Sequence, residues 1–154
     1  MIPKLTTAAA CRVARIDRDR FNEHVAAGRF RCAPCTVPGR SRLFDPDDMI
    51  ALWLFRDLMD DGYEAGKAGF IACEVADAAR RNPEVGAITF VEDYFEPRGG
   101  NAFPADQVPV PSEWDHVTFS GTNIRKATTF NITHLRRLIA HYTDEERSVV
   151  GERD

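Results

Sequence analysis

The sequence lacks any long run of apolar residues, and no stretch approaches the roughly 18 that a membrane-spanning helix needs. Its first residues, Met1 to Ala8, lack the positively charged start and the apolar stretch of a secretory signal peptide. We therefore expect an intracellular, cytoplasmic protein with no membrane partner. At 154 residues, with 44% hydrophobic and 29% charged side chains, the chain has enough apolar mass for one domain or two very small ones.

Cysteine is scarce, with four residues in the chain, Cys11, Cys32, Cys35 and Cys73. That number excludes a small disulfide-rich scaffold, and in a reducing compartment we expect all four to be thiols. Cys32-Ala-Pro-Cys35 has zinc-knuckle spacing, but a closed zinc site needs four ligands, and only distant cysteines or histidines would complete it. A thioredoxin-like redox motif would need a βαβ setting, which the pattern does not predict. We therefore interpret Cys32 and Cys35 as ordinary thiols.

Catalytic and cofactor-binding motifs are also missing. The sequence has no glycine-rich phosphate loop and no His-Glu-x-x-His pattern. The histidines are scattered, and although His134 and His141 share a helical face, no cysteine or carboxylate motif accompanies them. We expect no catalytic residue, no metal and no cofactor, and therefore a protein that is not an enzyme.

The charge of the chain is unevenly distributed. The formal net charge of −4 would by itself argue against a nucleic-acid partner. However, residues 1–44 hold nine Lys and Arg against three acids, a net charge of +6, whereas residues 45–100 hold five against thirteen, a net charge of −8. Attraction of a charged partner depends on the field within about one Debye length, roughly 8–10 Å. We therefore expect a single basic surface, formed by residues 1–44, that faces a charged partner. The alternative is that these arginines are simply solvated on the surface.

Two short helices are predicted at the start of the chain. Thr6 or Thr7 can cap a helix through Cys11, because a hydroxyl accepts the unpaired amides of a first turn. Asp17 starts a second helix, and Gly28 is its expected stop. These segments give a helix, a tight turn and a helix.

A hairpin and two longer helices are expected next. Residues 30–44 contain prolines and a turn signal at residues 37–40, which predicts an irregular β-hairpin with arginines on both arms. Asp45-Pro46 is a strong helix start, and the helix it begins ends at Asp60. A further amphipathic helix covers residues 64–81.

The second half predicts a small antiparallel sheet followed by one helix. The expected strands are residues 87–91 with 94–95, residues 116–119 and residues 127–130. Residues 98–112, which are rich in glycine and proline, are expected to form a loop. Asn131 or Thr133 caps a helix through Tyr142, and the charged residues 143–154 are expected to fray.

The order helix, turn, helix, arginine-bearing hairpin and acid-capped helix is that of a winged helix-turn-helix. Five segments carry a closer likeness: Leu5-Thr6-Thr7, Ile16-Asp17-Arg18-Asp19-Arg20-Phe21-Asn22, Ala26-Ala27-Gly28-Arg29-Phe30, Arg42-Leu43-Phe44-Asp45-Pro46-Asp47-Asp48 and Gly62-Tyr63. Over about residues 4–80 they resemble the winged-helix modules of the MerR superfamily and its excisionase-like relatives. Such modules have a Leu-Thr-Thr start, an arginine early in the second helix, a Gly-Arg-Leu exit and a Gly-Tyr or Gly-Phe corner.

The resemblance implies that double-stranded DNA is the partner, with the second helix in the major groove and the wing on the backbone or minor groove. Arg18 corresponds to the family's arginine in that helix, and Asn22 lies one turn further on, where it can read adenine. The threonines would offer a hydroxyl and a helix N-terminus to phosphate, and the wing arginines would contact phosphate. The candidate DNA-binding residues are Thr6, Thr7, Arg15, Arg18, Arg20, Asn22, Arg31, Arg40 and Arg42.

We therefore expect an α+β fold in two parts. Residues 1–82 would form the MerR-like winged helix-turn-helix domain with its two following helices, and residues 83–154 a small β-rich dimerisation or effector segment ending in a helix. Asn82-Pro83 stands where MerR regulators continue into a long dimerising helix, so the resemblance does not extend to their dimer interface, activation mechanism or ligand sensing. A homodimer is expected because such modules read two half-sites.

The function expected from the sequence is that of a sequence-specific DNA-binding transcriptional regulator, bacterial or phage-like in type and associated with the nucleoid. Two alternatives remain open. One is an architectural DNA-binding protein, such as an excisionase or a small packaging subunit, which bends DNA or builds a complex on it. The other is a protein-interaction adaptor that captures a partner through the acidic helices and the C-terminal segment.

Overall fold

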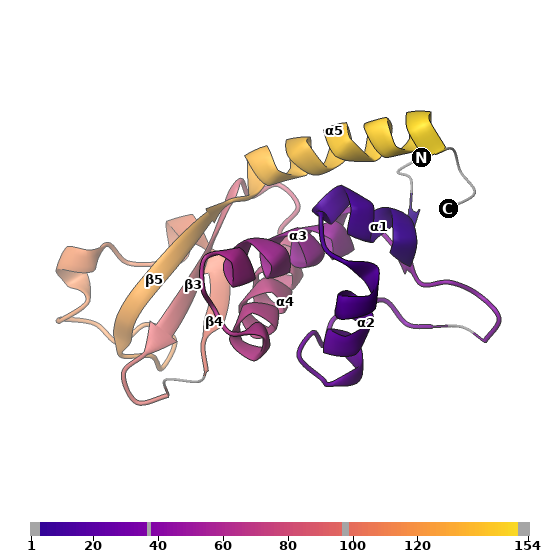
Figure 1. Cartoon of the computed structure of the whole chain (residues 1–154). Coiled ribbons are helices and arrows are strands. Elements are labelled where there is room, and N and C mark those ends of the chain that lie inside the picture. Colours follow the sequence, from indigo (N-terminus) through magenta and orange to yellow (C-terminus); the bar gives the residue numbers. More distant parts are fainter. Residues whose placement is uncertain (1–3, 37, 97–98, 151–154) are drawn as a thin grey trace.

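The computed structural model describes residues 4–36, 38–96 and 99–150, which form a mixed α/β fold with two small antiparallel sheets (Figure 1). The α-helices of these residues are α1 (Thr7–Ala14), α2 (Arg18–Ala26), α3 (Pro46–Asp60), α4 (Ala65–Arg81) and α5 (Ile132–Val150), and two single-turn 3-10 helices cover Ala105–Gln107 and Pro111–Glu113. The strands are β1 (Leu5–Thr6), β2 (Leu43–Phe44), β3 (Ala87–Asp93), β4 (Asn101–Pro104) and β5 (Ile124–Asn131). The α+β class expected from the sequence is therefore confirmed.

The predicted starts of the first two helices are confirmed by their caps. The Thr6 hydroxyl accepts a hydrogen bond from the Ala9 amide at 3.3 Å, and the Asp17 carboxylate accepts one from the Arg20 amide at 2.9 Å. Gly28 lies just beyond α2 with φ +76°, in the left-handed region that glycine adopts without strain. The glycine stop expected after α2 is thus also confirmed.

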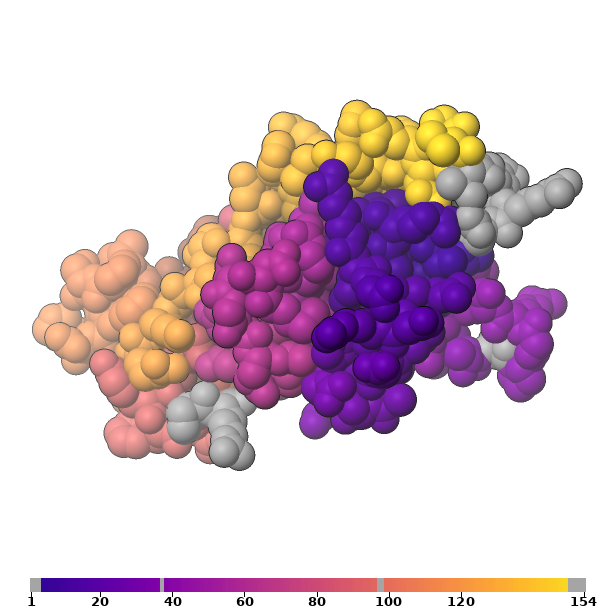
Figure 2. All heavy atoms as spheres, in the orientation of Figure 1, coloured from indigo at the N-terminus to yellow at the C-terminus, as the bar shows by residue number. Residues whose placement is uncertain are grey.

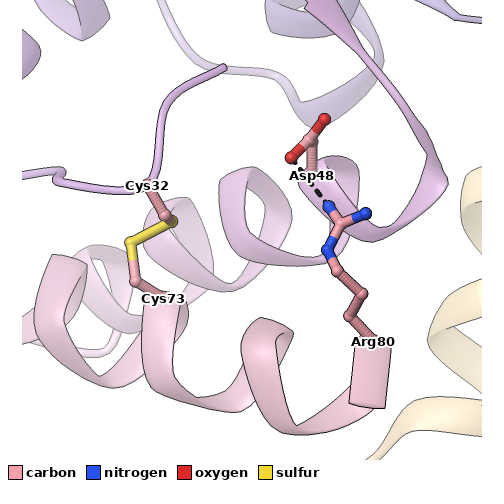
Figure 3. The surroundings of a disulfide bond; sticks show 4 residues. All are labelled: Cys32, Asp48, Cys73 and Arg80. Atoms are coloured by element: carbon pink, nitrogen blue, oxygen red, sulfur yellow. Dashed lines mark hydrogen bonds and ion pairs between the residues drawn. A yellow bond between two sulfur atoms is a disulfide. The ribbon is translucent and has the colours of Figure 1, made fainter. Parts of the chain in front are cut away.

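The start of α3 is held by a reciprocal cap and by α4. The Asp48 amide donates to the Asp45 carboxylate at 2.8 Å, and the Asp45 amide donates to the Asp48 carboxylate at 2.9 Å. Arg80, in the last turn of α4, donates to Asp45 at 2.8 Å and to Asp48 at 3.0 Å (Figure 3). Burial opposes ionisation of Asp45, but the bonds from Arg80 and from the Asp48 amide outweigh it and lower the pKa of this carboxyl.

Loss of the Arg80 guanidinium is expected to lower the free energy of unfolding by about 1 kcal/mol at neutral pH, since these pairs are partly exposed. Because the native pKa of Asp45 is lowered, this stabilisation is present above the ordinary pKa of the carboxyl and is lost as the pH falls below it. The difference in urea unfolding between Arg80→Gln and wild type should therefore be larger at about pH 7 than at about pH 3, because it declines as the pH falls toward the lowered native pKa of Asp45. Arg81→Gln, which breaks an exposed pair with Asp77, is the control and should cost less than about 0.5 kcal/mol. An equal difference for Arg80→Gln at both pH values would contradict this assignment.

The interior is one continuous cluster of buried side chains to which every helix contributes. Helices α3 and α4 pack against each other, α4 lies on the sheet β4–β3–β5, and α5 crosses α1 and α3 (Figure 1). The rings of Phe21 and Phe55 flank that of Phe30, with ring centroids 5.3 Å and 5.0 Å from it. The boundary expected at residue 82 falls between α4 and β3, and buried residues on both sides of it belong to this cluster.

The expected hairpin over residues 30–44 is wrong. Within the described part of this segment only Leu43 and Phe44 form a strand, β2, and it pairs with β1, so that Phe44 lies opposite Leu5. Pro34 and Pro38 lack the amide hydrogens that a strand ladder needs, and this weakens pairing between the two arms. The segment instead begins against α4, and the part around residues 38–42 is a loop that projects from the body of the molecule (Figure 1).

The strand predictions of the second half are partly confirmed. The strands expected at residues 87–91 and 127–130 are present within β3 and β5. Residues 94–95 form an exposed bend, and residues 116–119 contribute only a single bridge between Phe119 and Thr122, so both of these expected strands are wrong. Residues 98–112, expected to be a loop, contain strand β4, because an edge strand tolerates the proline at its end.

Helix α5 is longer than predicted. The Asn131 side chain accepts a hydrogen bond from the His134 amide at 3.1 Å, which confirms the expected cap. The helix then continues to Val150, so the expected fraying is wrong for residues 143–150, and residues 151–154 lie outside the described part of the chain. Thr143 is buried, and Glu146 accepts a hydrogen bond from Arg12 of α1 at 2.6 Å. Packing against α1 thus stabilises turns that the charged sequence alone would leave loose.

Candidate nucleic-acid interface

Helix α2 presents polar side chains at its start. Arg18, Arg20 and Asn22 are all exposed, and Arg18 and Asn22 lie one turn apart on one face. Asp19 and Glu23 are also exposed and one turn apart, and they occupy the outermost strip of the helix. The basic side chains therefore flank an acidic strip and are concentrated in the first turn.

The far end of α2 is joined to the following loop. Arg29 donates a hydrogen bond from Nε to Nδ1 of His24 at 2.9 Å, and the His24 ring packs edge-on against Phe55. Burial and the neighbouring charges of Arg29 and Arg20 lower the pKa of His24, so the imidazole accepts this bond as a neutral ring. The direction in which the chain leaves α2 is therefore fixed by a side-chain contact.

The three arginines predicted for the wing differ in their surroundings. Arg31 and Arg40 are both exposed, and Figure 2 shows that the loop around residues 38–42 stands out from the body. Arg42 is half-buried, and its guanidinium donates a hydrogen bond to the carbonyl oxygen of Pro34 across the loop. Arg42 thus braces the loop, while Arg31 and Arg40 remain accessible to a partner.

The other predicted contacts lie at the two ends of α1. Thr6 caps the helix and Thr7 is its first residue, and both side chains are partly buried. Arg15 ends α1 with φ +60°, and its guanidinium lies over the ring of Tyr142 at 5.2 Å from the centroid. The structure therefore brings Arg15 to α5 and not to the exposed surface of α2.

A disulfide corrects the expectation that all four cysteines are thiols. Cys32 is bonded to Cys73 on α4, with the two Cα atoms 5.7 Å apart and a sequence separation of 41 (Figure 3). Gly69 lies one turn before Cys73, and a Cβ atom on it would be 1.8 Å from the carbonyl oxygen of Arg29. The segment that follows α2 thus lies directly on α4 and is covalently fixed there. The interpretation of Cys32 as an ordinary thiol was wrong because its partner is remote in sequence.

The two remaining cysteines are expected to differ sharply in reactivity. Cys35 is exposed, whereas Cys11 is buried, and burial raises the pKa of the Cys11 thiol to about 12. Because the thiolate is the reactive form, N-ethylmaleimide should label Cys35 at least about 100-fold faster than Cys11 in brief treatment near neutral pH. Mass mapping of the labelled peptides checks this, with urea-unfolded protein as the control in which both react. Equal labelling of the two in the native protein would contradict it.

A buried charge cluster that was not predicted from the sequence joins α4 to strands β3 and β5. Glu92 on β3 is fully buried and accepts hydrogen bonds from Lys67 of α4 at 2.7 Å and Arg125 of β5 at 3.2 Å. Lys126 places its ammonium 3.5 Å from the other carboxylate oxygen. Ile88, Phe90 and Glu92 alternate along β3 and therefore share one face of the strand. This alternation is the sequence pattern from which the inward direction of the Glu92 side chain could have been predicted. The cluster ties α4 to two strands of the sheet.

A hollow of about 780 Å³ lies between the loop and α4. Arg29 and Arg31 line it from the loop side, and Lys67, Glu64 and Glu74 from α4. Its mixed charge does not favour one class of ligand, so the exposed loop arginines and the start of α2 remain the stronger candidate surface.

No helix among residues 4–36, 38–96 and 99–150 is long and apolar enough to cross a membrane. Within the same residues, no group of three or more histidine, cysteine or acidic side chains is arranged to hold a metal ion. Comparison of the chain with known protein families and with curated proteins found no match.

Proposed function

We propose that this protein is a sequence-specific DNA-binding transcriptional regulator, with α1 and α2 acting as a helix-turn-helix and the loop over residues 31–42 as its wing. The observation that carries the proposal is the exposure of Arg18, Arg20 and Asn22 at the start of α2 together with that of the loop arginines. They belong to a segment, residues 1–44, with a net charge of +6, whereas the rest of the chain is acidic. Helix-turn-helix proteins read base edges with the first residues of the second helix, and these are the positions occupied here.

The charges of α2 indicate how the helix would approach DNA. Glu23, one turn beyond Asp19 on the outermost strip, would be repelled by phosphates, so the helix would enter the major groove by its N-terminal turn, where Arg18 and Arg20 outnumber Asp19. Arg18 would then pair with a guanine edge and Asn22 with an adenine edge. Arg31 and Arg40 would contact phosphate, which positions the protein without reading sequence.

Two variants test these roles. Arg18→Ala with Arg20→Ala should weaken binding to the preferred DNA about 100-fold, because the base contact of Arg18 is worth about 1–3 kcal/mol and a second positive charge in the first turn is lost with Arg20. Arg40→Ala should weaken binding to all sequences by a smaller factor and reduce the salt slope by about 1. The measurement is a fluorescence-anisotropy titration across salt on fragments selected from genomic DNA. Arg137→Ala, an exposed arginine on α5, is the matched control and should bind as wild type.

Absence of binding to any genomic fragment at low salt would contradict the proposal, as would unchanged binding by the Arg18 and Arg20 double variant. The same fragments separate a regulator from an architectural protein, because the latter bends DNA strongly with little preference among sequences.

A further inference from the structure

Three of the four cysteines gather around one loop. Cys32 and Cys73 form the disulfide, and the exposed thiol of Cys35 lies three residues after Cys32 in the same segment, with the spacing Cys-x-x-Cys. Cysteines at this spacing close into a disulfide with each other in thiol oxidoreductases. Cys32 therefore has two possible partners, one on α4 and one on its own loop.

We propose that Cys35 is a thiol–disulfide exchange site that transfers the cross-link from Cys32–Cys73 to Cys32–Cys35. The Cys35 thiolate attacks Sγ of Cys32, the sulfur–sulfur bond to Cys73 breaks, and Cys73 leaves as a thiolate. The proton released from Cys35 is taken up by Cys73. One disulfide is broken and one is formed, so the step needs no oxidant or reductant.

The surroundings of the disulfide leave it open to attack. Cys32 and Cys73 both line a hollow of about 230 Å³ on the surface of α3 and α4. Asp47, Asp48 and Asp77 line the same hollow with one cation, Arg80. An excess of carboxylates repels small anionic thiols such as glutathione, whereas the thiol of Cys35, three residues from Cys32 in the same segment, is present at high effective concentration. Tethering thus favours Cys35 over a thiol from solution.

The loop is able to make the turn that the exchange requires. A disulfide needs Cα atoms about 4.4–6.8 Å apart, so Ala33 and Pro34 must fold into a turn. Within this stretch Cys32 and Ala33 pack against the core, and the Pro34 carbonyl accepts a hydrogen bond from Arg42 across the loop. Exchange therefore breaks the disulfide and requires Cys32 and Ala33 to move from their places against the core.

Exchange releases the loop from α4. The Cys32–Cys73 bond joins residues 41 apart, whereas the new bond would close a small ring within the loop. Arg31 precedes Cys32, so it gains freedom once the link to α4 is lost. An effect on DNA affinity rests on the function proposed above, but the exchange itself does not.

Mapping of the cross-link tests the proposal without DNA. Purified protein is incubated at about pH 8, where ordinary thiols are partly ionised, then quenched with acid, alkylated with N-ethylmaleimide, digested and analysed by mass spectrometry. We expect a peptide joining Cys32 to Cys35 and alkylated Cys73 to appear together in the wild type. Neither should appear in Cys35→Ser, and Cys11→Ala should behave as wild type because its thiol is buried. Gly69→Ala, which loosens the segment on α4, should raise the exchanged fraction about tenfold or more.

Detection of the Cys32–Cys73 link alone in both wild type and Gly69→Ala would overturn the proposal. Equal release of Cys73 in Cys35→Ser would also overturn it, because another thiol would then be the attacking group. If Gly69→Ala does not fold, wild type in urea below its unfolding transition replaces it, and the same two outcomes decide. DNA titration of Cys35→Ser, which keeps the original link, measures the proposed function separately.

Discussion

Replacement of Cys73 by serine is expected to lower the melting temperature by about 10 °C. The Cys32–Cys73 bond closes a loop of 41 residues, and restricting a loop of that length in the unfolded chain is worth about 4 kcal/mol. For a chain of this size each kcal/mol corresponds to about 2–4 °C. Without the bond, Cys32 and its neighbours are also no longer fixed to the surface of α4. Differential scanning calorimetry under matched buffer conditions measures the shift.

A reductant provides the internal control for that result. Dithiothreitol should lower the melting temperature of the wild type to that of Cys73→Ser measured in the same reductant, which keeps Cys32 and Cys35 of the variant as thiols. Cys35→Ser, which removes an exposed thiol outside the bond, should melt within about 1 °C of the wild type. Identical melting of the wild type with and without reductant would show that the link does not contribute to stability.

Replacement of Gly69 by alanine is expected to cost about 3 kcal/mol, although alanine is normally the better residue inside a helix by about 1 kcal/mol. The added Cβ would lie 1.8 Å from the carbonyl oxygen of Arg29 and 3.4 Å from Cα of Phe30. These are backbone atoms and do not rotate away as a side chain does. Phe30 is fully buried against Phe21 and Phe55, so a shift of its backbone opens the core. Urea denaturation measures the loss.

Gly66 offers a matched control on the same helix. A Cβ there would lie 3.0 Å from a carboxylate oxygen of Glu64, at the end of a flexible side chain, so Gly66→Ala should change stability by less than about 1 kcal/mol. A double-mutant cycle adds a second check. Gly69→Ala should cost less in Cys73→Ser than in the wild type, because the displaced segment is then free to move away from α4. Equal costs in the two backgrounds would contradict the close docking inferred here.

Short-range signals in the sequence were sufficient to predict where helices begin. Thr6, Asp17, Asp45 and Asn131 each accept a hydrogen bond from the amide three residues later, as their residue types and positions indicated. The exposure of Arg18, Arg20 and Asn22 followed in the same way from the apolar periodicity that turns Phe21 inward. These features depend on neighbouring residues, so a local pattern contains the information that decides them.

The roles of the other candidate residues depended on remote partners. Arg15 and Arg42 belong to the same basic segment as Arg18, yet Arg15 lies over Tyr142 and Arg42 bonds the carbonyl of Pro34. Nothing in the local sequence distinguishes an arginine that faces solvent from one that packs on a distant helix. The sequence therefore indicated the basic surface but not which of its arginines contact other parts of the chain.

What the sequence determined by itself was the set of helices, the two main strands of the sheet and the concentration of positive charge in the first 44 residues. Only the tertiary structure decided that Cys32 bonds Cys73, that β2 pairs with β1, and that α5 extends to Val150 against α1. Each of these is a choice among several distant partners, and packing of the whole chain makes that choice. Local sequence propensity does not predict these pairings, because the groups that meet are tens of residues apart and become neighbours only in the folded protein.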